Sequence, residues 1–186
     1  RLRRRPIFWF AAIIIVATIL ISLFPGLFTG QDPAYCVLER HNGPAASGHP
    51  FGFDKQGCDI YARVIYGARA SVSVGVLTTI AVVIIGATIG ALAGYFGGWL
   101  DALLSRITDV FFAVPLLLAA IVFMQMFKES RSIMMVVTVL AAFGWTQIAR
   151  ITRGAVMTAK NEEFVTAARA TGASRARILV SHIIPN

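Results

Sequence analysis

Hydrophobic and polar positions are arranged in long blocks along this chain. Four stretches contain no Asp, Glu, Lys or Arg: residues 6–31, 70–100, 110–127 and 132–149. About 20 apolar residues, each rising about 1.5 Å, cross a hydrocarbon core roughly 30 Å thick. Each stretch can therefore hold one transmembrane helix, although the last two need flanking residues. The pattern predicts an all-α integral membrane protein with four spans.

The polar segments between the spans divide the chain into four parts. We expect N-terminal cytoplasmic residues and the first span over 1–31, an external loop over 32–69, spans two to four over 70–150, and a cytoplasmic segment over 151–186. Within the loop, residues 54–57 suggest a turn. Asp59 can cap a short surface helix that places Ile60, Val64 and Ala68 on one face.

The N-terminal "RLRRR" followed by an apolar run also resembles a secretory signal peptide. The run continues beyond Leu23 and no A-x-A site closes it, which favours an uncleaved span. With this end inside, eleven of the 17 Lys and Arg residues fall in inner segments and six in outer ones. Basic residues concentrate in cytoplasmic loops, so a cytoplasmic N-terminus is expected. The basic residues are dispersed along the chain. The net charge of +8 is therefore best explained by membrane topology and by contact with lipid headgroups, and no nucleic-acid binding is expected.

Glycine and proline residues mark where the predicted spans pack together and where they end or bend. Gly86, Gly90 and Gly94 recur every four residues, a spacing that forms a helix-packing stripe in membranes. Gly97 and Gly98 should end span two, and residues 101–106 should form a brief inner turn. Pro115 is expected to kink span three.

Polar chemistry inside the predicted membrane is sparse. Asp109 follows Arg106 by three residues, so these two side chains are expected to pair at the membrane edge. No lysine follows a glycine, which excludes a G-x-x-x-x-G-K-[ST] phosphate loop from this sequence. The three histidines are too scattered for a catalytic triad or an H-E-x-x-H site. We therefore expect no catalytic, cofactor or metal site in this chain, and any nucleotide chemistry must belong to another chain.

Both cysteines, Cys36 and Cys58, fall in the external loop. An oxidising compartment favours a disulfide between them. Two free thiols, or a metal site completed by His41 and His49, are the alternatives, although the Cys and His spacing matches no common zinc motif.

The last 24 residues, "EFVTAARATGASRARILVSHIIPN", read as two short helices joined at Gly172. Asn161 can cap the first and Ser174 the second. An apolar stripe is expected on the second helix, formed by Ala176, Val180 and Ile183. The first helix presents a flat alanine surface beside basic groups, which suits docking into a partner's groove. A helix lying on anionic lipid is the alternative.

The run "TAARATGASRARILVSHIIP" is similar to the EAA loop of binding-protein-dependent ABC importer permeases, in which E-A-A is followed by three residues, Gly, nine residues and I-x-L-P. Ala167, Ala168, Gly172 and Pro185 match in register, whereas Thr166 replaces Glu. The resemblance implies that this loop couples to an ATPase. It points to Ala167, Ala168 and Gly172 for docking, with Arg169 and Arg175 as charge contacts.

A second similarity narrows the family. "HPFGFDKQGCDIYARVIYGARASVSVG" and "GYFGGWLDALLSRITDVFFAVP" resemble segments of the C-type permease subunit of dipeptide and oligopeptide importers, with Phe53 and Cys58 replacing the usual Thr and Arg. This implies the type I ABC importer permease fold in a bacterial inner membrane. Six helices are usual in this family, so four spans here would leave two beyond Asn186.

The resemblance implies alternating access of the permease to the two sides of the membrane. The implied partners are a homologous B-type permease, two ATP-binding subunits that carry ATP and Mg²⁺, and an external peptide-binding protein. Nickel or another small solute is an alternative cargo. A secondary transporter driven by an ion gradient is disfavoured because the four uncharged stretches hold no ionisable group near the bilayer midplane. A structural anchor would leave the EAA register unexplained.

Overall fold

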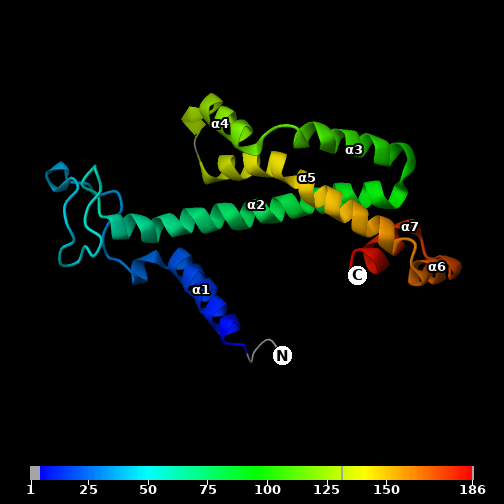
Figure 1. Ribbon diagram of the computed structural model, residues 1–186, viewed down its shortest axis with the longest axis horizontal. Helices are drawn as coiled ribbons and strands as arrows, with labels where there is room; N and C mark the ends of the chain where they lie inside the picture. Colours follow the sequence, from blue (N-terminus) through cyan, green and yellow to red (C-terminus); the bar gives the residue numbers. More distant parts are fainter. Residues whose placement is uncertain (1–4, 131, 186) are drawn as a thin grey trace. The chain divides into compact units, whose positions relative to one another are not determined.

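The computed structural model describes residues 5–130 and 132–185, and the regular elements in these residues are all helices (Figure 1). The α-helices are α1 (Pro6–Leu23), α2 (Ile60–Phe96), α3 (Gly98–Phe112), α4 (Leu116–Met126), α5 (Ile133–Ala159), α6 (Glu163–Ala170) and α7 (Arg175–Ile178). Short helical turns are η2 (Pro25–Leu27), η3 (Leu38–Arg40), η4 (Lys128–Ser130) and the π-helical η5 (Leu179–Ile183). Arg1, Arg3, Arg4 and Arg131, counted above for orientation, lie outside the described residues, as does Asn186.

Three helices are long and apolar enough to cross a membrane: α1, α2 and α5. The pair α3 and α4, bent by 73°, makes a fourth if it is one broken span. The side chains of α1 are almost all exposed, including Ile13 and Ile15, and only Ser22 is buried. Exposed apolar surface on this scale fits a lipid environment. The predicted all-α membrane fold is confirmed.

The second span is longer than predicted. Helix α2 starts directly after Asp59, whose Oδ1 accepts a hydrogen bond from the Ala62 N–H at 2.8 Å, and it continues for 37 residues. The separate surface helix expected at 60–68 is therefore wrong, because no proline interrupts the helix before the glycine pair at its end. The predicted cap at Asp59 is correct.

The corner after α2 consists of two glycines. Gly97 and Gly98 have φ angles of 66° and 59°, which are readily accessible only without a side chain. Because the chain reverses within these two residues, 101–106 lie inside α3, and the inner turn expected there is wrong.

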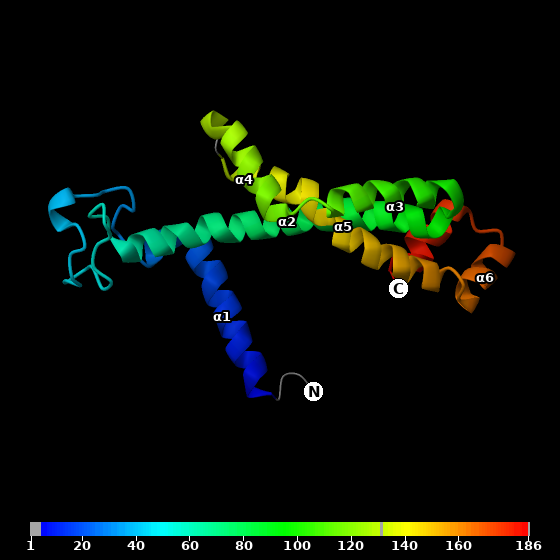
Figure 2. The same cartoon turned by 45° about the horizontal axis from the view of Figure 1, so that its top comes forward.

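Pro115 breaks the third span rather than kinking it. Helix α3 ends at Phe112 and α4 starts at Leu116. Proline lacks the N–H that would bond to the carbonyl four residues earlier, and it pushes the preceding Val114 away from helical geometry. Helices α3 and α4 both pack against α5 within the unit 76–186 (Figures 1 and 2).

The loop between α1 and α2, in the unit 1–75, is held by a disulfide between Cys36 and Cys58. Gly57 has a φ of 74°, and a Cβ there would collide with the Val37 carbonyl oxygen. His49 contacts Asp59. Among the described residues there is no group of three or more His, Cys, Asp and Glu side chains placed to hold a metal ion. Of the three interpretations for the cysteines, the structure has the disulfide.

Asp54 organises the turn beside this disulfide. Its Oδ1 accepts hydrogen bonds from the Cys58 N–H at 3.0 Å and the Gln56 N–H at 2.8 Å, and its Oδ2 contacts Arg63. The Cys58 hydrogen bond is the largest cause that lowers the pKa of Asp54, and with the other two contacts it outweighs the opposing effect of burial. Asp54 is therefore held as a carboxylate at neutral pH.

Without reductant, we expect neither cysteine to react with a membrane-impermeant maleimide in intact cells, and both to react after reduction. Cys58→Ser should expose one thiol, at Cys36, and should lower the free energy of unfolding by about 3 kcal/mol, because the constraint on the unfolded loop is lost. Labelling is read by mobility shift, and Ser47→Cys, at an exposed position of the same loop, would serve as a positive control for reactivity. Equal labelling of both wild-type cysteines without reductant would contradict the bond.

Candidate coupling site

The C-terminal residues 163–185, here called the coupling segment, form two helical parts around a glycine corner. Gly172 has a φ of 82°, and its N–H donates to the Arg169 carbonyl at 3.1 Å. This is the left-handed helix end that the sequence pattern predicts. Ser174 caps the second part, because its Oγ accepts from the Arg177 N–H at 3.3 Å.

The predicted cap of the first part is wrong. The N-cap residue of α6 is Glu162, whose side chain makes no cap hydrogen bond. Asn161 instead donates from Nδ2 to the Met157 carbonyl at 3.0 Å. The Asn161 amide bonds to the last turn of α5, because α5 continues to Ala159, beyond residue 150 where the fourth span was predicted to end.

The buried side of the coupling segment packs on the ends of α2 and α5. Val165 and Ile178 are fully buried or nearly so. The cluster they belong to also contains Ala91, Val156, Leu179 and Ile183. These contacts link the segment to the ends of two long helices.

The apolar stripe predicted for the second helix is largely wrong. Ile183 is buried, but Ala176 and Val180 are exposed, and Ile178 and Leu179 are buried in their place. The α-helical part of this region is only one turn long, and the chain continues as a π-helix in which the Ile184 N–H donates to the Leu179 carbonyl. The wider turn changes the angular spacing of side chains on which the prediction depended.

Four of the five candidate coupling residues are exposed: Ala167, Arg169, Gly172 and Arg175. Ala168 is half-buried and packs against the buried cluster. The exposed four lie on α6, at the glycine corner and at the start of α7, so they form the outer surface of the segment at its bend. A partner can reach them without unfolding the segment.

A glycine stripe brings α2 and α5 together beside the segment. A Cβ at Gly86 would lie 2.7 Å from the Trp145 carbonyl oxygen, and one at Gly94 would lie 2.7 Å from that of Arg153. At Gly90 a Cβ would collide with the Ala149 carbonyl oxygen. Each glycine therefore faces the α5 backbone, one turn further along than the last, as small residues do where membrane helices pack closely.

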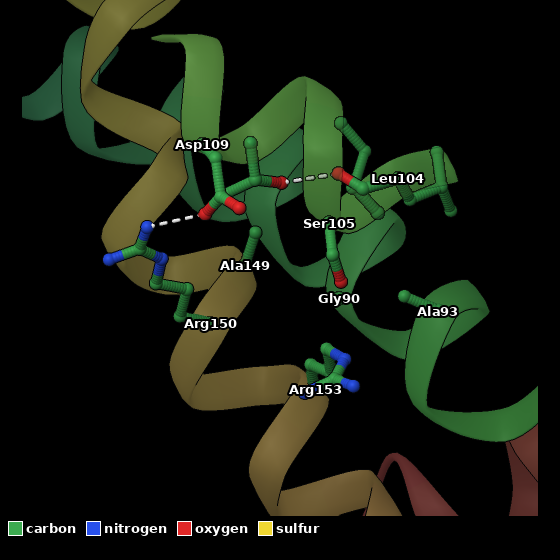
Figure 3. A pocket seen from close by; sticks show the side chains of 10 residues that line it. Gly90, Ala93, Leu104, Ser105, Asp109, Ala149, Arg150 and Arg153 are labelled. Atoms are coloured by element: carbon green, nitrogen blue, oxygen red, sulfur yellow. Dashed lines mark hydrogen bonds and ion pairs between the residues drawn. The ribbon is translucent and has the colours of Figure 1, made fainter. Parts of the chain in front are cut away.

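Two ion pairs join α3 to α5. Arg153 donates to both carboxylate oxygens of Asp101, at 2.5 and 2.6 Å, in the two-bonded geometry that fixes both side chains. Arg150 donates to Asp109 at 2.7 Å (Figure 3). The expected pairing of Asp109 with Arg106 is wrong, since Asp109 pairs with α5 instead.

These pairs border a hollow of about 450 Å³ between α2, α3 and α5. Ser105 and Thr108 of α3 line it, together with Gly90 of α2. Sequence reasoning missed both ion pairs because their members are 52 and 41 residues apart. The only sign of these pairs in the sequence was that α3 contains aspartates and α5 contains arginines. The spacing of residues along the sequence does not show which of them meet.

A match with known proteins covers this region. Residues 86–186, which include the glycine stripe, both ion pairs and the coupling segment, match the family described as binding-protein-dependent transport system inner membrane component. The chain belongs to this family. It is therefore a multi-pass inner membrane component, and the resemblance stated from the EAA register is confirmed.

Curated relatives extend the similarity to the whole chain. The oligopeptide transport system permease protein OppC of Bacillus subtilis is 35% identical over 186 residues, which is 100% of this chain and 60% of the relative. The dipeptide transport system permease protein DppC of Alkalihalophilus pseudofirmus is 39% identical over 178 residues, 94% of this chain and 57% of the relative. The glutathione transport system permease protein GsiD of Pectobacterium atrosepticum is 36% identical over 151 residues, 81% of this chain and 50% of the relative. The chain thus spans half to three-fifths of the length of these relatives.

The contact between α2 and α5 can be tested with matched glycine substitutions. We expect Gly90→Ala to lower the free energy of unfolding by about 1–3 kcal/mol, because the added methyl group forces the two backbones apart. Gly154→Ala, in α5 where a Cβ meets no atom within 4 Å, should be neutral or slightly stabilising. Thermal unfolding in detergent measures both, and equal effects of the two variants would count against close packing at Gly90.

Proposed function

We propose that this chain is the permease subunit of an ATP-driven importer for peptides and forms part of the transmembrane path. The observation that carries the proposal is the family match over residues 86–186, which ends on a coupling segment whose candidate docking residues are exposed, apart from the half-buried Ala168. The relatives named above are permeases for oligopeptides, dipeptides and glutathione. Peptides of a few residues are therefore the favoured cargo, and nickel or another small solute is the alternative.

The energy source would be ATP hydrolysed in two partner subunits. The sequence has no phosphate loop, so nucleotide chemistry would reside in those subunits with their Mg²⁺. A homologous B-type permease would supply the other half of the path. An external peptide-binding protein would deliver the cargo, in keeping with the family's description as binding-protein-dependent.

Coupling would pass through the buried side of the segment. A partner that docks on Ala167, Arg169, Gly172 and Arg175 holds the outer surface, while Val165 and Ile178 transmit its position to α2 and α5. Nucleotide binding can bias the permease only if the ATPase contacts this surface differently in two states. Alternating access then follows from the movement of packed helices as bodies.

The membrane orientation is part of the proposal. A cytoplasmic N-terminus places the loop 32–69 outside and the coupling segment inside. The disulfide between Cys36 and Cys58 supports this orientation independently of the basic-residue count. Disulfides persist outside the cytosol, where thiols are not kept reduced.

A pair of substitutions at the glycine corner tests coupling. Gly172→Val should reduce peptide uptake by about tenfold or more in proteoliposomes of the complete importer, because a β-branched residue disfavours the left-handed conformation found there. Membrane insertion and part of the ATP hydrolysis should remain. Gly172→Asn should retain most of the uptake, because asparagine tolerates this conformation and a Cβ there meets no atom within 4 Å.

Uptake and ATP hydrolysis are measured on the same preparation, so loss of coupling is separated from loss of the complex. Normal uptake by Gly172→Val would contradict the assigned role of the corner. Equal loss in both variants would show that the left-handed conformation is not what matters.

A further inference from the structure

A hollow of about 290 Å³ lies at the break between α3 and α4 (Figure 1). Val114 and Pro115 line it from the break, and Thr146 and Gln147 line it from α5. The break belongs to the uncharged stretch 110–127, and the helices on both sides of it are apolar. Whether α3 and α4 form a broken span or a re-entrant loop, this hollow therefore lies at membrane depth.

The break leaves backbone polar groups without partners. Among the described residues, no hydrogen bond reaches the carbonyl oxygen of Ala113 or that of Val114. The first turn of α4 has no side-chain cap, because its N-cap residue is Pro115. Non-helical backbone at membrane depth is tolerated only where protein covers it or where it lines a water-filled cavity. The break is therefore a poor surface for contact with lipid tails.

Polar side chains of α5 meet the break at the same hollow. Thr146 is 3% exposed, yet its hydroxyl group makes no hydrogen bond with any described residue. The hydroxyl groups of Thr138 and Thr158 in the same helix donate to carbonyls four residues earlier, at 2.8 and 3.2 Å. Gln147, the next residue, is exposed and brings an amide to the hollow. The hydroxyl group of Thr146 is thus the unpaired one of the three.

Aromatic side chains hold the wall of the hollow in place. The Phe111 ring packs against the rings of Phe143 and Trp145, with centroids 5.8 and 5.7 Å away. On the next residue, the Phe112 ring has the Arg150 guanidinium 4.0 Å from its centroid. Both residues before the break are therefore anchored to α5, so the unpaired carbonyl groups keep a fixed position beside Thr146 without any bond to it.

We propose that this hollow is a contact point for the peptide in transit, whose backbone hydrogen-bonds to the Thr146 hydroxyl group and to the Ala113 and Val114 carbonyl oxygens. The inference rests on the proposed function of peptide import. Every peptide carries backbone N–H and C=O groups, so such contacts suit cargo with varied side chains. An apolar helix of the partner permease fits less well, because it would cover these polar groups without bonding to them. Discontinuous membrane helices form substrate sites in other transporters.

ATP-dependent peptide uptake by proteoliposomes of the complete importer tests the hydroxyl contact. Thr146→Val should lower the maximal uptake rate about fivefold, roughly the effect of one lost hydrogen bond. It should not lower the thermal stability of the complex, because the hydroxyl group has no partner in the described chain. Thr146→Ser keeps the hydroxyl group and should retain most of the uptake. Thr138→Val, which removes a hydroxyl group of α5 outside the hollow, should transport as the wild type does.

A second variant, Val114→Cys, keeps the backbone carbonyl and leaves α5 unchanged. With the native cysteines joined in their disulfide, a water-soluble methanethiosulfonate reagent should modify this thiol, and saturating peptide with binding protein and ATP should slow the modification severalfold. Ile121→Cys, exposed on α4 outside the hollow, should react at a rate that does not depend on peptide.

Wild-type uptake separates the two levels of the argument. If the wild type takes up no peptide, the proposed function fails. If it does, equal maximal rates for Thr146→Val and the wild type overturn the contact point alone. An unreactive Val114→Cys shows that lipid or a partner helix covers the break, and equal modification rates with and without peptide show that no cargo passes it; either result also overturns the inference.

Discussion

The close approach of α2 and α5 across Gly86, Gly90 and Gly94 is the constraint on which the rest of this region depends. Lipid tails are as apolar as leucine, so burial of apolar surface gives little drive for two helices to pair inside a membrane. Backbone contact supplies the missing attraction, and only glycine allows the α2 backbone to come this close to the carbonyl groups of α5. The ends of these two helices then form the surface on which Val165 and Ile178 are buried.

The ion pairs extend the same frame to α3. A charged side chain inside a membrane protein is costly unless it is paired, which explains why Asp101 and Asp109 each face an arginine of α5. The Asp101 pair is the more sheltered of the two, since the aspartate side chain is 19% exposed against 51% for Asp109. The frame made by α2, α3 and α5 therefore carries both close packing and directional contacts, and the coupling segment is attached at its end.

Local patterns in the sequence predicted much of this arrangement. Glycine and proline were informative because they disturb a helix through their own backbone properties. Gly97 and Gly172 follow helix ends as expected, whereas Pro115 breaks the helix that it was expected only to kink. The disulfide could be predicted because both cysteines fall in one loop. The EAA register of the sequence indicated the family, which the match over residues 86–186 confirms.

What failed depends on contacts between distant residues or on a change of helix type. Arg106 is the arginine nearest to Asp109 in the sequence, yet Asp109 pairs with Arg150 of α5. Local spacing alone does not tell which of the two arginines Asp109 will pair with. Val180 is exposed because the chain becomes π-helical at Leu179, where a period of 3.6 residues no longer applies. The hollow of about 560 Å³ lined by Lys160, Arg169 and Arg175 could not be predicted for the same reason, since these residues meet only when α5 and the segment have packed.

Cross-linking from the exposed bend tests the central claim most directly. With the native cysteines joined in their disulfide, Ala167→Cys in the assembled importer should form a cross-link to an ATPase subunit through a short thiol- and amine-reactive reagent, and its yield should change between nucleotide-free and ATP-bound complexes. Phe51→Cys in the loop between α1 and α2, which the proposed orientation places on the opposite side of the membrane, should form no such cross-link. If Ala167→Cys fails to reach the ATPase in either state, while the complex remains assembled, the coupling segment is not the contact through which ATP acts.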